Sequence, residues 1–91
     1  MANRPTAIKS IRQNARRRLR NKAAKSRLRT ETNKLDRMLQ RGEVSDAEDQ
    51  FAVLTRLLQR AAARHIVHPN MAARKQAQYQ KRVNELKAAS A

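Results

Sequence analysis

Residues 35–58 read LDRMLQRGEVSDAEDQFAVLTRLL and contain Gly42, the only glycine of the chain. Leucines spaced three or four residues apart precede and follow this glycine, as on one face of a helix. Glycine adopts positive φ at little cost, so Gly42 is well suited to end a helix just after Arg41. Ser45, followed by Glu48 three residues later, matches a capping box. We therefore predict that one helix ends before Gly42 and that the next begins at Ser45.

The first helix is expected to run from about Thr6 to Gln40, a length of about 50 Å. Its second half can pack in a core, because apolar or small residues line one face: Ala24, Leu28, Thr32, Leu35, Met38 and Leu39. Its first half carries cations around the whole axis and only a weak apolar stripe, so it cannot be buried. We expect a basic helical arm at residues 1–23, which frays in the free protein, and a packed domain at residues 24–91.

Two further helices complete the expected fold, and β-branched residues are too sparse to favour strands. The apolar face of the second helix consists of Phe51, Leu54, Leu57, Leu58 and Ala61. The third helix is expected to begin near Asn70 as its N-cap, with Ala72, Tyr79, Val83 and Leu86 facing inward. Because short connections make consecutive helices antiparallel, we predict an all-α three-helix antiparallel bundle with a long, protruding basic first helix.

The charge of the chain indicates the class of its partner. Eleven of the 22 lysines and arginines lie in the first thirty residues, Glu31 is the first acidic residue, and the formal net charge is +15. So many like charges repel one another unless a polyanion neutralises them, and nucleic acid is the densest polyanion in a cell. Arginine, which outnumbers lysine, pairs bidentately with phosphate. The candidate contacts that follow from charge include Arg12, Arg16, Arg17 and Lys75.

The scarcity of aromatic residues narrows the kind of nucleic acid. With one Phe, one Tyr and no Trp, the chain lacks the platforms on which proteins stack successive single-stranded bases. A structured RNA or a duplex, contacted through its phosphates and its shape, fits this composition better than a single strand does. RNA is favoured over DNA because a long helix with cations on every side can lie among several RNA helices, whereas a DNA reader needs a dedicated recognition face.

Other classes of function receive little support. There is no cysteine, so we expect neither disulfides nor a cysteine-ligated zinc site, and a reducing compartment fits best. His65 and His68 resemble an H-x-x-H metal pair but lack further ligands nearby, so we expect no metal. Asp46, Glu48 and Asp49 suit a helix N-terminus, where negative charge is favoured. No catalytic motif occurs, and we expect no enzyme activity, no cofactor and no small-molecule substrate.

Three alternatives stay open at this point. Basic amphipathic helices can lie on anionic membranes, but the apolar stripe of the arm is too narrow for this, no run of residues could span a bilayer, and no secretory signal is evident. A small DNA-compacting protein of the nucleoid type would also use a basic surface. A helical module that docks another protein would use the apolar faces and would leave the charge run unexplained.

Two signatures in the chain resemble a known family. The first comprises Ala7-Ile8-Lys9, residues 18–22 (RLRNK), Lys25-Ser26 and Arg29-Thr30, and the second comprises residues 67–68 (VH), Asn70 and residues 72–74 (AAR). Both are similar to the S-twenty family of bacterial small-subunit ribosomal proteins. The similarity covers nearly the whole chain. His65, Pro69, Met71 and Gln76 depart from the residues that are common in the family.

The resemblance implies a three-helix bundle that binds small-subunit ribosomal RNA directly and holds RNA helices together. It implies a monomer within the ribosome, with neighbouring ribosomal proteins as further partners, in the cytoplasm of a bacterium or in an organelle. The residues that it places near RNA are Lys9, Arg18, Arg20, Asn21, Lys22, Lys25, Ser26, Arg29, His68, Asn70 and Arg74.

Overall fold

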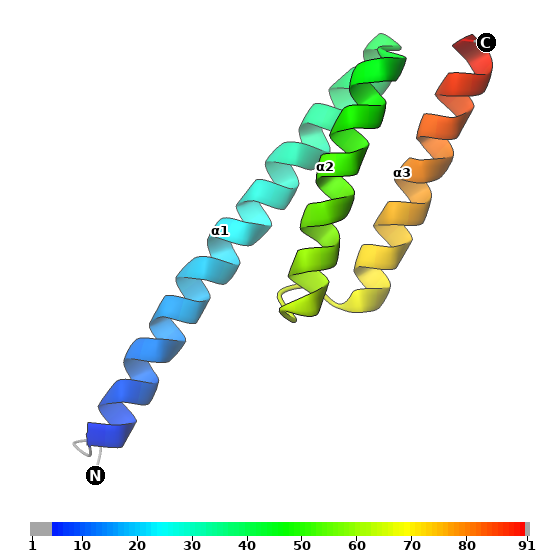
Figure 1. Cartoon of the computed structure of the whole chain (residues 1–91). Coiled ribbons are helices and arrows are strands. Elements are labelled where there is room, and N and C mark those ends of the chain that lie inside the picture. Colours follow the sequence, from blue (N-terminus) through cyan, green and yellow to red (C-terminus); the bar gives the residue numbers. More distant parts are fainter. Residues whose placement is uncertain (1–4, 91) are drawn as a thin grey trace.

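The computed structural model describes residues 5–90, with side chains from residue 8 onward, and consists of three helices (Figure 1). They are α1 (Pro5–Arg41), α2 (Val44–Ala63) and α3 (Pro69–Ser90). Residues 5–90 contain no strand. The predicted all-α fold is therefore confirmed, and the bounds expected for the first helix differ from the observed ones by one residue at each end.

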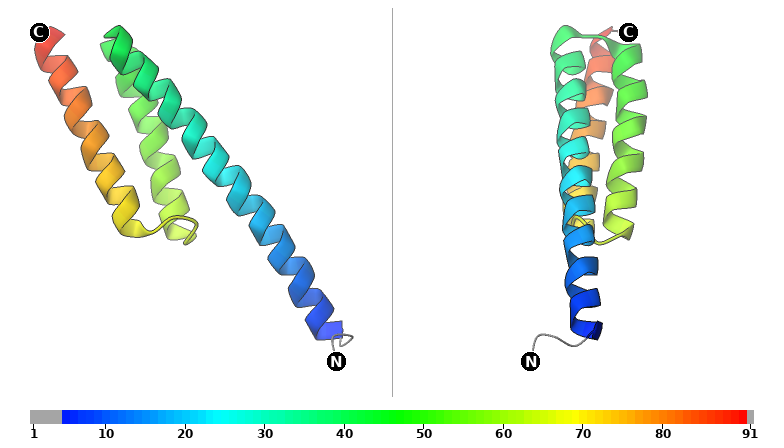
Figure 2. Two further views of the ribbon diagram at one scale, coloured as in Figure 1. Left: turned by 180° about the vertical axis from the view of Figure 1, so that it is seen from behind. Right: turned by 90° about the vertical axis from the view of Figure 1, so that its left-hand side faces the viewer.

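The three helices form an elongated bundle in which consecutive helices run antiparallel (Figures 1 and 2). The middle helix, α2, packs extensively against both α1 and α3, whereas α1 and α3 contact each other much less. With 37 residues, α1 is far longer than α2 and α3, which have 20 and 22. Its N-terminal half, blue in Figure 1, therefore extends beyond the bundle, and the molecule measures 66 × 21 × 14 Å. The predicted protrusion of the first helix is confirmed.

The core lies between α2, α3 and the C-terminal half of α1. Leu35, Leu54 and Leu58 are the largest fully buried side chains, each at most 1% exposed. Burial of one leucine stabilises a fold by about 1.5–3 kcal/mol. The remaining buried residues are Leu28, Ala47, Ala61, Val67, Ala72, Tyr79 and Val83. Residues that pack against this core and are partly buried include Met38, Leu39, Phe51, Leu57 and Leu86.

The turn between α1 and α2 is built on Gly42, as predicted. Gly42 has a positive φ of 74°, and its N–H donates to the carbonyl oxygen of Leu39 at 3.3 Å. The next N–H, that of Glu43, donates to the carbonyl oxygen of Met38 at 3.1 Å. These two bonds are the Schellman motif, which satisfies carbonyl groups that the end of a helix leaves without partners.

The predicted start of the second helix at Ser45 is wrong. The Schellman motif uses only Gly42 and Glu43, so α2 begins at once with Val44, and the carbonyl oxygen of Glu43 accepts the first helical bond, from Ala47. Ser45 lies inside the first turn, and no side chain caps this end. Glu48 does not reach back to the cap; it forms an ion pair with Lys87 of α3, with an Nζ–Oε1 distance of 2.8 Å.

The loop between α2 and α3 folds back onto the end of α2. His65 has a positive φ of 58°, a conformation that glycine adopts without steric cost and other residues seldom adopt. The N–H of Ile66 donates to the carbonyl oxygen of Ala61 at 2.9 Å. This turn directs Val67 into the core, where it is 8% exposed.

The predicted N-cap of the third helix, Asn70, is also wrong, because α3 begins at Pro69. Proline is favoured at the first helical position, since it lacks an N–H group that would have no partner there. His68 precedes it and serves as the cap: its Nδ1 accepts a hydrogen bond from the N–H of Asn70 at 3.1 Å, and its carbonyl oxygen accepts from the N–H of Ala72.

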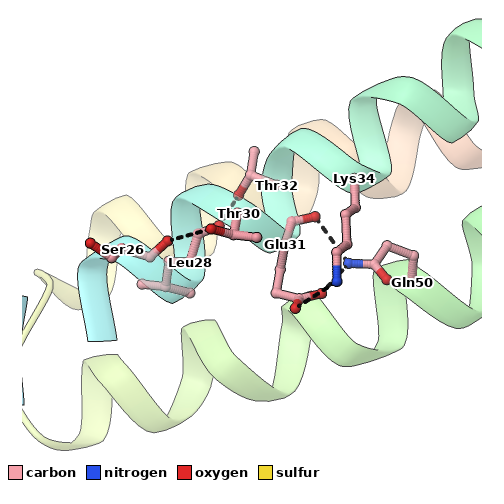
Figure 3. Close-up of polar contacts among 7 residues, drawn as sticks. All are labelled: Ser26, Leu28, Thr30, Glu31, Thr32, Lys34 and Gln50. Carbon is pink, nitrogen blue, oxygen red and sulfur yellow. Dashed lines mark hydrogen bonds and ion pairs between the residues drawn. The ribbon is translucent and has the colours of Figure 1, made fainter. Parts of the chain in front are cut away.

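Polar side chains connect α1 with both other helices. The amide Nε2 of Gln50, on α2, donates to the backbone carbonyl oxygen of Glu31 at 3.0 Å and also to the Glu31 carboxylate (Figure 3). Lys34 pairs with the same carboxylate at 3.5 Å. On the α3 side, Asp36 accepts hydrogen bonds from Tyr79 Oη and from Arg82, both at 3.0 Å. Desolvation, and then the Asp36 carboxylate, raise the pKa of Tyr79.

The arm is continuous with the rest of α1. Every side chain from residue 8 to residue 23 is exposed, and from residue 8 onward Ala24 is the first partly buried residue of the helix. The division of the chain into an arm at residues 1–23 and a packed domain at residues 24–91 stays a prediction. Within residues 5–90, no helix combines the length and the apolar character that a membrane span requires.

Candidate nucleic-acid interface

The arm presents cations in every direction around α1. Even its large apolar residues are exposed: Ile8 is 41%, Ile11 63% and Leu19 69% exposed. The three ion pairs among residues 8–90 are Lys34–Glu31, Arg82–Asp36 and Lys87–Glu48, and none involves a residue of the arm. Residues 8–23 of the arm therefore offer their positive charge without an internal counter-charge.

Most of the predicted contact residues of α1 fall into two groups on different sides of the helix. One shallow surface near the start of α1 includes Lys9, Arg12 and Arg16. A second surface, farther along, is formed by Arg18, Asn21, Lys22, Lys25, Ser26 and Arg29. The second set recurs every three or four residues, which places its members on one stripe of a helix. Arg17 and Arg20 belong to neither surface and are exposed.

A groove with a volume of about 610 Å³ lies where α1 leaves the bundle, and we call it the junction groove. It brings together Lys25 and Arg29 of α1 with His68 and Lys75, although 39 to 50 residues of sequence separate the first two from the last two. Its apolar lining consists of Leu28, Leu58, Ile66, Val67 and Met71, and its polar lining is completed by Thr32 and Asn33.

Two predicted contact residues of α3, Asn70 and Arg74, do not line the junction groove. Asn70 is exposed, and its N–H is bound by the imidazole of His68. Arg74 is exposed on α3 and does not line the junction groove. Since Nδ1 of His68 accepts this bond from Asn70, Nε2 is the ring nitrogen that remains for contact with a ligand.

Three further arginines were not among the predicted contacts. Arg27 of α1, Arg60 of α2 and Arg64, which directly follows α2, line a second groove of about 260 Å³. This groove shares Leu28 and Ile66 with the junction groove. Arg60 and Arg64 are four residues apart, a helical spacing that the sequence does show, although α2 ends at Ala63. That Arg27 faces them depends on the packing of α1 on α2.

Acidic residues avoid both grooves, since no carboxylate lines either. Four of the seven acidic residues lie at the turn between α1 and α2 or in the first turns of α2, at the end of the bundle away from the arm: Glu43, Asp46, Glu48 and Asp49. Glu31 is held within the bundle, and the hydrogen bond from Gln50 lowers its pKa, against the effect of partial burial. The arm and both grooves therefore form a region of unopposed positive charge.

The part of the chain that the structure describes contains no cluster of three His, Cys, Asp or Glu side chains that could hold a metal ion. His65 and His68 do not form such a site with any carboxylate. The geometry suits the binding of an extended anion through guanidinium and ammonium groups.

Comparison with known proteins identifies the family. A model of the family described as "Ribosomal protein S20" matches residues 2–84. The chain belongs to this family. The "Small ribosomal subunit protein bS20" of Brucella canis is 43% identical over 88 residues, which cover 97% of this chain and 100% of the relative. That of Mycolicibacterium smegmatis is 38% identical over 86 residues, which cover 94% of this chain and 100% of the relative.

The resemblance read from the two sequence signatures is thus confirmed. Ribosomal protein S20 is a family of small-subunit ribosomal proteins, which is a structural and not an enzymatic class.

Proposed function

We propose that this member of the S20 family binds small-subunit ribosomal RNA directly and holds neighbouring RNA helices together. The observation that carries the proposal is the arm, where every side chain from residue 8 to residue 23 is exposed and no cation pairs with a carboxylate of the described residues. Guanidinium groups on several sides of one helix can neutralise phosphates of more than one RNA strand, which otherwise repel each other.

The contacts that we propose are the residues predicted from sequence. On the arm and the adjoining turn of α1 they are Lys9, Arg12, Arg16, Arg17, Arg18, Arg20, Asn21, Lys22, Lys25, Ser26 and Arg29. On the loop and α3 they are His68, Asn70, Arg74 and Lys75. Membership of the family, and the names of the relatives as small-subunit proteins, support RNA of that subunit as the partner. The proposed location is the ribosome in the bacterial cytoplasm, where the chain acts as a monomer.

The test is the salt dependence of binding to small-subunit ribosomal RNA. Each phosphate that a cation neutralises contributes about 0.7–0.9 to the slope of log affinity against log salt concentration. Replacing Arg16, Arg17, Arg18 and Arg20 with glutamine should reduce this slope by about three. The helical content of the bundle should not change, because these side chains are exposed.

A matched control removes the same charge elsewhere. Arg37, Arg41, Arg56 and Lys81 are exposed and lie outside the arm and both grooves. Glutamine at these four positions should change the slope much less. If the arm variant has the slope and affinity of the unchanged protein, the arm is not the binding element.

A DNA-compacting role is the second candidate, because the same cations would neutralise DNA. Co-sedimentation distinguishes an RNA-binding role from a DNA-compacting role. The protein should travel with small ribosomal subunits at moderate salt, and ribonuclease should release it. Recovery with DNA after ribonuclease treatment would favour the second candidate.

A further inference from the structure

We propose that the junction groove seats a single unpaired nucleotide of the RNA, with its base against the apolar lining and its phosphates at the cationic rim. The inference rests on the proposed function and adds to it a ligand class that phosphate neutralisation does not require. It is carried by the juxtaposition of apolar and cationic side chains from α1, the α2–α3 loop and α3 at one place.

The apolar lining is the first step of the argument. Leu28 and Val67 are buried at its base, while Met71 is 41% exposed at its edge. An exposed methionine beside a basic surface contributes nothing to the binding of phosphate. Its polarisable thioether does interact favourably with flat aromatic systems, and its flexibility lets it adapt to either size of base.

The rim supplies the charge that a nucleotide needs. Lys25, Arg29 and Lys75 lie around the groove, and no carboxylate lines it. Lys75 is half-buried, and lysine side chains commonly cover apolar surface with the aliphatic stem while the ammonium group stays in solvent. Asn33 adds an amide that can both donate and accept, which suits the edge of a base. An uncharged apolar partner would leave these cations without a counter-charge.

The size of the groove favours one nucleotide over a duplex. Its volume of about 610 Å³ lies within the range of about 300–1,000 Å³ that is typical of small-ligand sites. Bases in a duplex are stacked and paired, so their faces cannot reach an apolar surface. An unpaired base in a loop or bulge can turn outward and present its face.

The test uses the full chain and small-subunit ribosomal RNA, with affinity measured over a range of salt concentrations. Met71→Ala should weaken binding about three- to tenfold at every salt concentration and leave the slope unchanged, because the lost contact is apolar. Met71→Leu keeps the apolar surface and should bind as the unchanged protein does. Lys75→Gln should instead reduce the slope by about 0.7–0.9. Since Met71 is exposed, both of its variants should keep the stability of the fold, which thermal unfolding checks.

Chemical probing of the bound RNA supplies a second readout. One unpaired nucleotide should be protected by the unchanged protein and by Met71→Leu, and should regain reactivity with Met71→Ala. Suppose that the unchanged protein binds the RNA, but that Met71→Ala binds equally well, or binds more weakly without a change in the reactivity of any unpaired nucleotide. The proposed nucleotide site would then be contradicted, while the proposed function would stand. If the unchanged protein does not bind the RNA, both fall.

Discussion

Gln50 shows how one side chain couples two helices. Its amide donates to the backbone and to the carboxylate of Glu31, nineteen residues earlier. The bond to the carboxylate lowers the pKa of Glu31 from its ordinary value of 4.5, burial opposes the change, and Lys34 adds to the lowering. The folded state thus binds this proton less readily than the unfolded chain. The stability that results is present above pH 4.5 and is lost as the pH falls through the lower pKa of the folded state.

We expect Gln50→Leu to lower the free energy of unfolding at neutral pH by about 1 kcal/mol, through loss of these hydrogen bonds. The decline in stability below pH 4.5 should also become shallower, because the pKa of Glu31 moves back toward its ordinary value. Denaturant unfolding at a series of pH values measures both. Gln59→Leu, at an exposed position of the same helix, is the control. A Gln50→Leu protein with the acid sensitivity of the control would contradict this account.

Residue contacts of this kind could not be predicted from the sequence, whereas the buried faces could. The spacing of Leu54 and Leu58 places them on one side of any helix, and both are buried. Whether Gln50 meets Glu31 depends on how far α2 is rotated and shifted along α1. Periodicity alone does not determine either quantity.

The ends of the helices could be predicted from the sequence only in part. Gly42 was predicted because a positive φ favours a single residue type, and it does end α1. At helix starts several residue types are acceptable, so the choice among neighbouring candidates depends on packing. Ala47 is fully buried, and α2 begins at Val44, one residue before the serine that the local rules favour. At α3 an unusual cap, His68, replaces the expected asparagine.

The capping role of His68 leads to a prediction about stability. His68→Ala removes the acceptor for the N–H of Asn70 and should lower the free energy of unfolding by about 1 kcal/mol. His68→Asn provides a side-chain oxygen at the same place and should retain most of the stability. Thermal unfolding of the three proteins measures the difference. Equal stability of all three would show that the imidazole does not act as a cap.

For the molecule as a whole, the sequence revealed the charge but not its arrangement. The stripe of Lys22, Lys25 and Arg29 follows from helical spacing alone. The junction groove does not, because Lys25 and Lys75 line the same groove only when α1 and α3 both pack against α2. The second groove, with Arg27, was missed for the same reason. Contact of the predicted residues with RNA stays a prediction.

Over residues 8–23 the helix of the arm has no buried side chains to stabilise it, so we expect its stability to depend on bound RNA. Residues 8–23 bury no side chain, so only backbone hydrogen bonds and intrinsic propensity favour their helix. A helix of about this length is marginal in water without tertiary contacts, and repulsion among its cations weakens it further. We therefore expect fast amide exchange before residue 24 in the RNA-free protein, and slow exchange around Leu35, Leu54 and Leu58, which are fully buried.

Amide hydrogen exchange followed by NMR makes this measurement, and the buried half of α1 serves as an internal control within the same helix. Addition of small-subunit ribosomal RNA should slow exchange in the arm, because phosphates remove the repulsion and the contacts order the side chains. Multivalent anions such as sulfate should have a smaller effect in the same direction. Slow exchange across residues 8–23 without RNA would mean that the arm is rigid by itself. Ordering of the arm would then contribute nothing to the salt dependence or to the specificity of binding.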